Sequence, residues 1–451
     1  MKKSPLASIL SIVFIDLIGF GMIIPILPLY AQRFHANEWQ IGFLIASYSF
    51  MQFLASPILG WFSDKYGRKP VLLCSLVGSA TGYILMADAG SLFMLFLARV
   101  LAGVAGASVG TASAYIADIT PPENRSKRIG LIGAAFGIGF VLGPAIGGIL
   151  SQWFVVAPFW FAAILSTLNA ILMWIVLPEP DRHAARQQGP LNLKQTFKQA
   201  GSWRLGVITA TYFIAIAGFA IVTVIYPQVG QRRFELNQSQ NSYIFVMLGL
   251  IGAAIQGGGI GKLSKRFGDV SLAITGFAIM SVSMLLMPLA GSLPLFLLFS
   301  AGLAVGNSLS QPTVNAIASK GATAALQGRV LGVVQSAGSL GRVFGPVLAG
   351  FLLAGDHSRP ASLYGNTPFL AGGILIAIAF FLATNLRRPE PAKAVTPSPV
   401  EADKREQNRL RSQFVLAGEG EGDAASLAPF AARAAIILAF ASLCAAAKCI
   451  C

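Results

Sequence analysis

The chain has 451 residues, of which 55% are hydrophobic and 11% are charged, compared with about 25% charged residues in soluble domains. This composition excludes an ordinary soluble fold and indicates a membrane protein that crosses the bilayer many times. The formal net charge of +15 would suggest nucleic acid binding in a soluble protein. Here the basic residues fall in short segments between apolar runs, as in the cytoplasmic loops of membrane proteins, so we expect no nucleic acid partner.

A helix needs about 20 apolar residues to cross a bilayer, and the sequence predicts twelve such helices. A polar stretch after the sixth separates them into two sets of six. The fold class is therefore an all-α polytopic membrane protein embedded in the lipid bilayer. The predicted spans are 8–30, 40–60, 71–88, 92–116, 130–151, 157–177, 205–227, 242–261, 271–290, 293–315, 328–353 and 367–386.

These spans predict a division of the chain into an N-terminal six-helix bundle over 1–177, a cytoplasmic central loop over 178–204 and a C-terminal six-helix bundle over 205–387. The tail, 388–451, begins with a charged, proline-rich stretch that predicts disorder. It also holds a short apolar segment whose status stays open, because its uninterrupted part is short for a span.

The Lys and Arg residues predict the orientation of the chain. If the N-terminus is inside, the inside segments before the tail carry 18 of them and the outside loops carry four. Cytoplasmic loops of membrane proteins carry an excess of these residues. The N-terminus and the central loop are therefore expected on the cytoplasmic side.

Two sequence patterns recur between the halves at nearly one offset. "GWFSDKYG" starts at Gly60 and "GKLSKRFG" starts at Gly261, while "GFVLGPAIGG" (139–148) is echoed by "GRVFGPVLAG" (341–350). The recurrence indicates a duplicated six-helix unit in parallel orientation. Parallel halves of this kind bind their substrate between them, near the middle of the membrane.

Ionisable residues inside the spans are costly and are functional candidates by default. Asp16 is the one carboxylate well inside a predicted span, and Arg99 and Arg342 lie inside the fourth and eleventh spans. Desolvation disfavours a charged carboxylate and a nearby guanidinium favours it, so a transporter that moves the cation changes the proton affinity of the acid. We therefore predict proton coupling by Asp16 and Arg99. The alternative is that Asp16 and Arg99 form a fixed structural ion pair or cap backbone groups.

The fifth predicted span contains the pattern G-x-x-x-G-P-x-x-G-G. Gly139, Gly143 and Gly147 fall on one helix face, where they let a neighbouring helix approach closely. Pro144 removes a backbone donor and bends the helix. Small residues that pack helices are common in membranes, but the added Gly-Pro pair and the second glycine, Gly148, make the pattern more specific.

Substrate contacts are expected on the inner faces of both halves. The predicted cavity is largely apolar with few charges, which suits a hydrophobic or amphiphilic small molecule. Each candidate residue could instead serve helix packing or interhelical hydrogen bonding. No cysteine or histidine cluster has metal spacing, and the glycine-rich "GGGIGKLS" lacks the spacing of a phosphate loop, so we expect no cofactor. The candidates are Gln52, Tyr83, Tyr212, Gln256, Asn307, Gln311, Gln335 and Arg342.

Several of these stretches resemble one transporter family. "GWFSDKYGRKP" is similar to the loop motif of the major facilitator superfamily, "LARVLAG" resembles its fourth-helix motif, and "GIGFVLGPAIGG" resembles its antiporter motif. "DLIGFGMIIPILP" and "YIADITPPENR" resemble the twelve-helix drug:proton antiporters, most of all the tetracycline efflux group. The resemblance covers about residues 8–390.

The resemblance implies export of a drug or antibiotic, driven by the proton gradient through alternating access. It implies a proton and substrate relay that includes Asp16 and Arg99. It also implies a functional monomer in a bacterial inner membrane. A cytoplasmic gate is implied as well. Within it we expect Arg68 to pair with the acid at the end of the fourth helix, and Asp64 to pair with the positive dipole end at the start of the eleventh helix, near Arg329. The implied gate residues are Gly60, Asp64, Gly67, Arg68 and Asp118. Of these, Gly60 and Gly67 are expected to bound a tight turn between the second and third spans.

Two departures from the tetracycline exporters bear on the substrate. Those proteins carry an acidic residue before the third-helix tyrosine, where this chain has Gly82, and a histidine in the eighth helix, where this chain has none. In addition, the second copy of the loop motif carries Lys265 where the first carries Asp64. Tetracycline is therefore only one of the candidate substrates.

Two other functions stay open from sequence. A proton-coupled uptake or metabolite carrier would share the fold, and the fifth-helix motif favours export over it. A non-transporting membrane sensor would not need Asp16, Arg99 and the loop motif together. An enzyme is not expected, because no nucleophile and base pair or metal cluster is visible.

Overall fold

The computed structural model describes residues 5–121, 125–180, 202–321 and 327–387. Within these residues every regular element is a helix, and twelve helical segments are long and apolar enough to cross a membrane. The predicted all-α fold with twelve spans is confirmed. The described residues belong to one compact unit. The tail, 388–451, and most of the central loop lie outside them.

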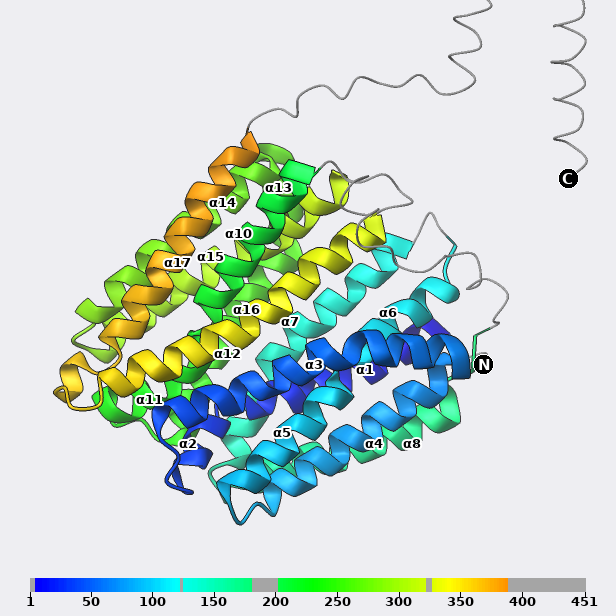
Figure 1. The fold of residues 1–451 in the computed structure, drawn as a ribbon, viewed down its shortest axis with the longest axis horizontal. Coiled ribbons are helices and arrows are strands. Elements are labelled where there is room, and N and C mark those ends of the chain that lie inside the picture. The colour runs from blue at the N-terminus through cyan, green and yellow to red at the C-terminus, as the bar shows by residue number, and fades with distance from the viewer. Residues whose placement is uncertain (1–4, 122–124, 181–201, 322–326, 388–451) are drawn as a thin grey trace, which may run out of the picture. The chain divides into compact units, whose positions relative to one another are not determined.

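The helices of the N-terminal half pack mainly on one another, and so do those of the C-terminal half (Figure 1). The N-terminal half contains α1 (Pro5–Ile23), α2 (Leu27–Gln32), α3 (Glu38–Tyr66), α4 (Arg68–Ala87), α5 (Leu92–Gly106), α6 (Ser108–Asp118), α7 (Arg125–Leu150) and α8 (Ala157–Val176). The C-terminal half contains α10 (Ser202–Ala220), α11 (Val222–Phe234), α12 (Gln238–Ala254), η3 (Ile255–Gly259), α13 (Ile260–Phe267), α14 (Asp269–Leu286), η4 (Met287–Leu289), α15 (Leu293–Lys320), α16 (Gln327–Gly355), η5 (Ala361–Leu363), α17 (Asn366–Thr384) and η6 (Asn385–Arg387).

The same N-terminal cap begins the second span of each half. The Asn37 side chain accepts a hydrogen bond from the Gln40 backbone, and the Gln40 side chain accepts one from the Asn37 backbone. Asn237 and Gln240 repeat this capping box at the start of α12. A capping box satisfies two backbone donors that a helix start leaves free. Its recurrence supports the duplication inferred from the sequence.

The structure corrects the expected turn between Gly60 and Gly67. Helix α3 continues through Tyr66, so Gly60 lies inside the helix, and no described atom lies within 4 Å of a Cβ placed there. The helix ends at Gly67, whose φ of 116° lies in a region that other residues rarely adopt. The turn is therefore made at one glycine rather than across eight residues.

Two predicted spans are locally irregular. The fourth is divided between α5 and α6 at Ala107. The eighth contains the π-helical turn η3, which includes Gly257, Gly258 and Gly259 and leads into α13. Short π-helical turns within α-helices are frequent at functional sites. Both breaks leave the number of spans unchanged.

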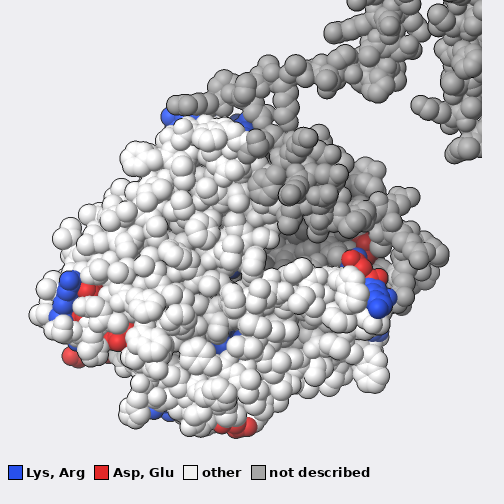
Figure 2. Space-filling view, viewed as in Figure 1, with Lys and Arg blue, Asp and Glu red and all other residues white. Residues whose placement is uncertain are grey.

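Large apolar side chains cover the outer surface of the helices. Phe93, Trp174, Ile175 and Phe381 each expose more than half of their surface. Figure 2 shows a face that is mostly uncharged, with the Lys, Arg, Asp and Glu atoms gathered mainly towards its margins. An uncharged belt of this kind is the surface that a lipid bilayer requires.

Candidate functional site

The two halves meet along a first seam between α3 and α16. A Cβ placed on Gly42 of α3 would lie 2.5 Å from the Pro346 carbonyl oxygen, and one on Gly350 of α16 would lie 2.7 Å from the Glu38 carbonyl oxygen. Such distances leave no room for a side chain at either glycine. The extracellular half of α3, as the Lys/Arg bias orients it, is therefore in backbone contact with α16.

A second seam joins α7 to α12. A Cβ on Gly148 would lie 2.9 Å from the Ser242 Cβ, and one on Gly249 would lie 2.9 Å from the Phe140 carbonyl oxygen. Gly148 is the last residue of the predicted antiporter motif. Its position gives the second glycine of that motif a structural role, because it lets the halves approach each other at this end.

Polar contacts reinforce both seams at the same end, which we call the outer gate. His357 Nδ1 lies 2.6 Å from Glu38 Oε1, and the Tyr364 hydroxyl lies 3.3 Å from the same oxygen. At the other seam, Gln152 Nε2 donates to the Ser239 hydroxyl at 3.0 Å and to a neighbouring tyrosine hydroxyl. At the outer gate, side chains of the N-terminal half therefore bind side chains of the C-terminal half. None of these residues was predicted from the sequence to have a role.

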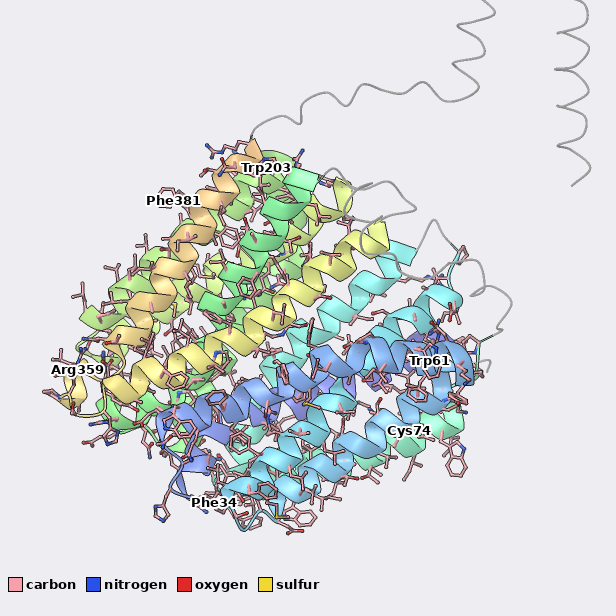
Figure 3. The ribbon with its side chains drawn as sticks, in the orientation of Figure 1. Phe34, Trp61, Cys74, Trp203, Arg359 and Phe381 are labelled. Carbon is pink, nitrogen blue, oxygen red and sulfur yellow. The ribbon has the colours of Figure 1, made fainter. Side chains whose placement is uncertain are left out.

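The opposite end of the halves is not joined in this way. No ion pair between described residues crosses the halves there, and none of the residues of η3 or α13 is buried. Trp61 of the N-terminal half and Trp203 of the C-terminal half, which both belong to this end, lie well apart (Figure 3). With the orientation that the Lys/Arg bias predicts, the structure is closed outside and separated inside, which is the inward-facing arrangement.

Replacing the acid of the outer gate should shift the balance between conformations. We expect Glu38→Gln to weaken outer closure by about 1 kcal/mol, roughly a fivefold change in the population ratio, because a carboxylate hydrogen-bonded to His357 and Tyr364 is replaced by a neutral amide. Spin labels at Gly90→Cys and Gly291→Cys can report this. These glycines lie in outer loops of the two halves, and a Cβ placed on either would meet no described atom within 4 Å.

The matched control for this measurement is Glu235→Gln, which neutralises an exposed acid in a nearby loop without breaking an ion pair between described residues. The label distance distribution should move to longer values for Glu38→Gln and stay unchanged for the control. An unchanged distribution for both variants would show that the outer gate is held by the glycine seams alone.

Asp16 lies in the interior of the N-terminal half. A cavity of about 20 Å³ adjoins its side chain, lined mainly by apolar residues of α1, α4, α6 and α8. That volume holds about one water molecule. Asp16 therefore has a largely apolar setting, in which the charged form of its carboxylate is costly.

Arg99 does not pair with Asp16 in this structure. Its guanidinium stacks 4.7 Å from the centre of the Tyr48 ring, and Nη2 lies 3.5 Å from the Ile45 carbonyl oxygen. The Tyr48 phenol interacts electrostatically with both Asp16 and Arg99. A fixed ion pair between Asp16 and Arg99 is therefore not found, whereas the contact of Arg99 with the Ile45 carbonyl agrees with the other alternative, a cap on a backbone group.

The glycines of the fifth-span motif pack against the helix that bears Asp16. A Cβ on Gly139 would lie 2.9 Å from the Leu17 Cβ, and one on Gly143 would lie 2.7 Å from the Met22 backbone nitrogen. Gly147 likewise faces the Met22 side chain. Pro144 lies within α7 between these contacts. The motif therefore fixes α7 directly against α1 over two turns.

Three charged side chains meet at the inner end of the N-terminal half, which we call the inner charge cluster. Arg68 Nη1 lies 2.6 Å from Asp64 Oδ1, and Arg68 Nε lies 2.9 Å from Asp118 Oδ2. The Asp64 side chain is 67% exposed. The structure thus brings Arg68 and Asp118 together, while the side chain of Arg329, the expected partner region of Asp64, lies outside the described residues.

Glu179 supports this cluster and was missed from sequence. Its carboxylate accepts hydrogen bonds from the backbone nitrogens of Arg68 at 2.6 Å and Lys69 at 2.8 Å, the first residues of α4. Gly67, which precedes them, has no side chain with which to cap the helix. An acid at a helix start is favoured by the free N–H groups and the helix dipole. The Pro-Glu-Pro sequence after α8 was the available signal.

The C-terminal half repeats the inner charge cluster with every sign exchanged. Asp269 follows Gly268 as Arg68 follows Gly67, and Asp269 Oδ2 lies 2.6 Å from Lys320 Nζ at the end of α15. Ser264 donates to Asp269, as Ser63 interacts with Arg68. Lys265 stands at the position of Asp64. The second copy therefore keeps an ion pair, but the acid and the base have exchanged positions. The sequence showed only that Lys265 replaces an acid, and it did not predict the pair of Asp269 and Lys320.

The candidate substrate residues occupy different places. Tyr83 is buried against Gly19 of α1, and Gln52 donates to the Gly106 carbonyl oxygen within the N-terminal half. Gln256 lies exposed in η3. The remaining candidates lie in the C-terminal half: Tyr212, Asn307 and Gln311 line a cavity of about 10 Å³, Gln335 donates to Asn315, and Arg342 donates to Ser339.

Comparisons with known proteins agree with this architecture. The family model described as Major Facilitator Superfamily matches residues 9–346 and 208–447. The chain is 32% identical to the class H tetracycline resistance protein of Pasteurella multocida, over 88% of this chain and 100% of that protein. It is 29% identical to multidrug resistance protein 1 of Bacillus subtilis (strain 168), over 86% of this chain and 98% of that protein.

A solved structure shares the fold. A bacterial homologue of the human lysosomal transporter Spinster, described as inward-facing and unoccupied, superposes with a TM-score of 0.70. The match covers 86% of this chain and 98% of that chain at 17% identity. At this identity the likeness concerns the fold alone.

Proposed function

Because the chain belongs to the Major Facilitator Superfamily and is therefore a membrane transporter rather than an enzyme, we propose that it exports a hydrophobic or amphiphilic small molecule in exchange for protons. The observation that carries the proposal is the direct packing of the α7 glycines on α1, the helix that bears Asp16. This contact couples a protonatable group to a helix that also forms a seam between the halves.

Asp16 is the proton site in this proposal. Protonation of Asp16 removes a negative charge from an apolar interior, and release of the proton restores that charge. Either change alters the forces on α1 and α3. Because α1 is packed on α7 and α3 on α16, a change at Asp16 reaches both seams without a long intermediate path.

The proposal takes its direction and substrate class from the relatives. Proteins named for tetracycline resistance and for multidrug resistance match this chain over almost their full lengths. The position of Gly82 and the absence of histidine from the eighth span favour an amphiphile other than tetracycline. The bacterial relatives favour a bacterial inner membrane, and the packing of both halves within one chain supports a functional monomer.

Transport assays test the proposal directly. Drug accumulation in pump-deficient cells should fall when the protein is expressed and should recover when an uncoupler dissipates the proton gradient. In inverted membrane vesicles the same substrate should be taken up as protons leave. Uptake by intact cells, with none by inverted vesicles, would instead indicate a proton-coupled importer of the same fold.

The inner charge cluster acts as the inner gate in this cycle. We expect Asp64→Asn to impair transport while leaving membrane insertion intact, because Asp64 is largely exposed in the inward-facing state and is free to meet the start of α16 when the inner end closes. Substrate efflux and membrane-fraction blots measure the two effects. Lys65→Gln, which removes a neighbouring charge, is the control; loss of membrane expression for Asp64→Asn would show a role in insertion instead.

A further inference from the structure

One face of α16 runs along the junction between the halves. Pro346 and Gly350 lie on this face and contact Gly42 of α3 at the outer gate. Residues four and seven positions apart share a helix face. By this spacing Gln335, Ser339 and Arg342 continue the same face towards the inner end. The face of α16 that contacts α3 at the outer gate therefore carries polar residues on the inner side of that contact.

Arg342 lies on this face of α16 and has no acidic partner among the ion pairs between described residues. Its Nη2 donates to the Ser339 hydroxyl at 2.9 Å, and its guanidinium interacts electrostatically with Tyr212 of its own half and Tyr48 of the other. A cation inside a membrane protein that lacks a counter-charge marks a substrate or ion pathway.

The charges around Tyr48 do not balance. Arg99, Arg342 and Asp16 all interact electrostatically with this phenol. Arg99 is only 5% exposed, and no ion pair between described residues includes it, so it also lacks an acid. Two guanidinium groups face at most one carboxylate, so the region stays positive whether or not Asp16 holds a proton.

We propose that Arg342 binds an anionic group of the exported molecule, so that the substrate is an amphiphilic organic anion. A guanidinium offers two parallel donors that match a carboxylate or sulfonate. The apolar body of the substrate would lie along the C-terminal half on the side of Tyr212, which lines a small cavity together with Asn307 and Gln311. This inference rests on the proposed exporter function and names its substrate class.

An anionic substrate has an electrical consequence. If one proton enters for each monovalent anion that leaves, both movements carry positive charge inward. The exchange is then driven by an inside-negative membrane potential as well as by the proton gradient. Export of a neutral molecule by the same exchange would move half as much charge.

The test uses anilinonaphthalene sulfonate and N-phenylnaphthylamine, two fluorescent probes with the same aromatic body, of which only the first is anionic. Binding is measured on the full chain in lipid nanodiscs, with empty nanodiscs subtracted. The wild type should prefer the sulfonate, and Arg342→Gln should weaken sulfonate binding by about 10-fold to 100-fold, the value of a charged hydrogen-bonded contact. Binding of the neutral probe should not change.

Two further variants keep the result interpretable. Arg342→Lys retains the charge and should recover part of the preference for the sulfonate. Arg266→Gln neutralises an exposed arginine of α13 and should behave as the wild type. Equal binding of the two probes by the wild type, or an equal loss of both in Arg342→Gln, would overturn the proposal.

Transport in proteoliposomes separates this inference from the exporter function. Sulfonate efflux should accelerate under a potassium diffusion potential that is negative on the side the probe leaves, and it should stop when protons are equilibrated. Efflux that ignores the proton gradient but still requires Arg342 would overturn proton exchange and support the anion site. Proton-dependent efflux of the neutral probe, with no efflux of the sulfonate, would support proton exchange and overturn the anion site.

Discussion

Asp16→Asn is expected to reduce proton-driven export to the uncoupled background while the protein is still made and inserted. Asparagine has nearly the same shape but cannot take up or release a proton, and it cannot alternate in charge beside Tyr48. The cavity next to Asp16 holds about one water and tolerates an amide. Substrate efflux in response to an imposed pH gradient measures the effect.

The control is Asp88→Asn, which neutralises an exposed acid at the end of α4. It should export as the wild type does. Substrate counterflow without a pH gradient gives a second measurement, because exchange of substrate for substrate requires no net proton movement. Asp16→Asn should retain counterflow. Normal proton-driven export by Asp16→Asn would remove Asp16 from the mechanism.

Gly143→Val is expected to have the largest effect on the structure itself. Its Cβ alone would lie 2.7 Å from the Met22 nitrogen and 2.8 Å from the Ile18 carbonyl oxygen, and both are backbone atoms that cannot rotate away. Overpacking of this kind costs about 1–3 kcal/mol or more. The variant should lower the Tm and abolish transport by forcing α7 away from α1.

Helix α7 contains its own matched control. A Cβ on Gly137 meets no described atom within 4 Å, so Gly137→Val makes the same chemical change in the same helix without the clash. Thermal unfolding followed by size-exclusion chromatography compares the two variants. Equal Tm values would mean that α7 and α1 separate readily, contrary to the role proposed for the glycine motif.

The architecture was predictable because it follows from local sequence. Apolar runs long enough to cross a bilayer predicted twelve spans, and the repeated patterns predicted two matching halves. The spacing of Gly139, Gly143 and Gly147 predicted one packed face, and the structure shows which helix that face contacts. Helical periodicity specifies a face but not its partner.

Contacts between distant residues were not predictable in the same way. Glu38 and His357 are separated by most of the chain, and each taken alone is an ordinary charged residue near a helix end. Glu179 looked like part of a polar linker until the start of α4 was placed beside it. Gly60 was wrongly expected to bound a turn, because the sequence does not distinguish a glycine inside a helix from a glycine that ends one.

The sign-inverted charge clusters limit how the two halves could have diverged from a common ancestor. Arg68 stands beside two acids, and Asp269 stands beside Lys320. Reversing either central residue alone would place like charges within about 3 Å of each other in a partly buried site, which is strongly unfavourable. Descent from one cluster to the other therefore required paired changes or neutral intermediates. Among relatives we expect these positions to vary as sets rather than one at a time.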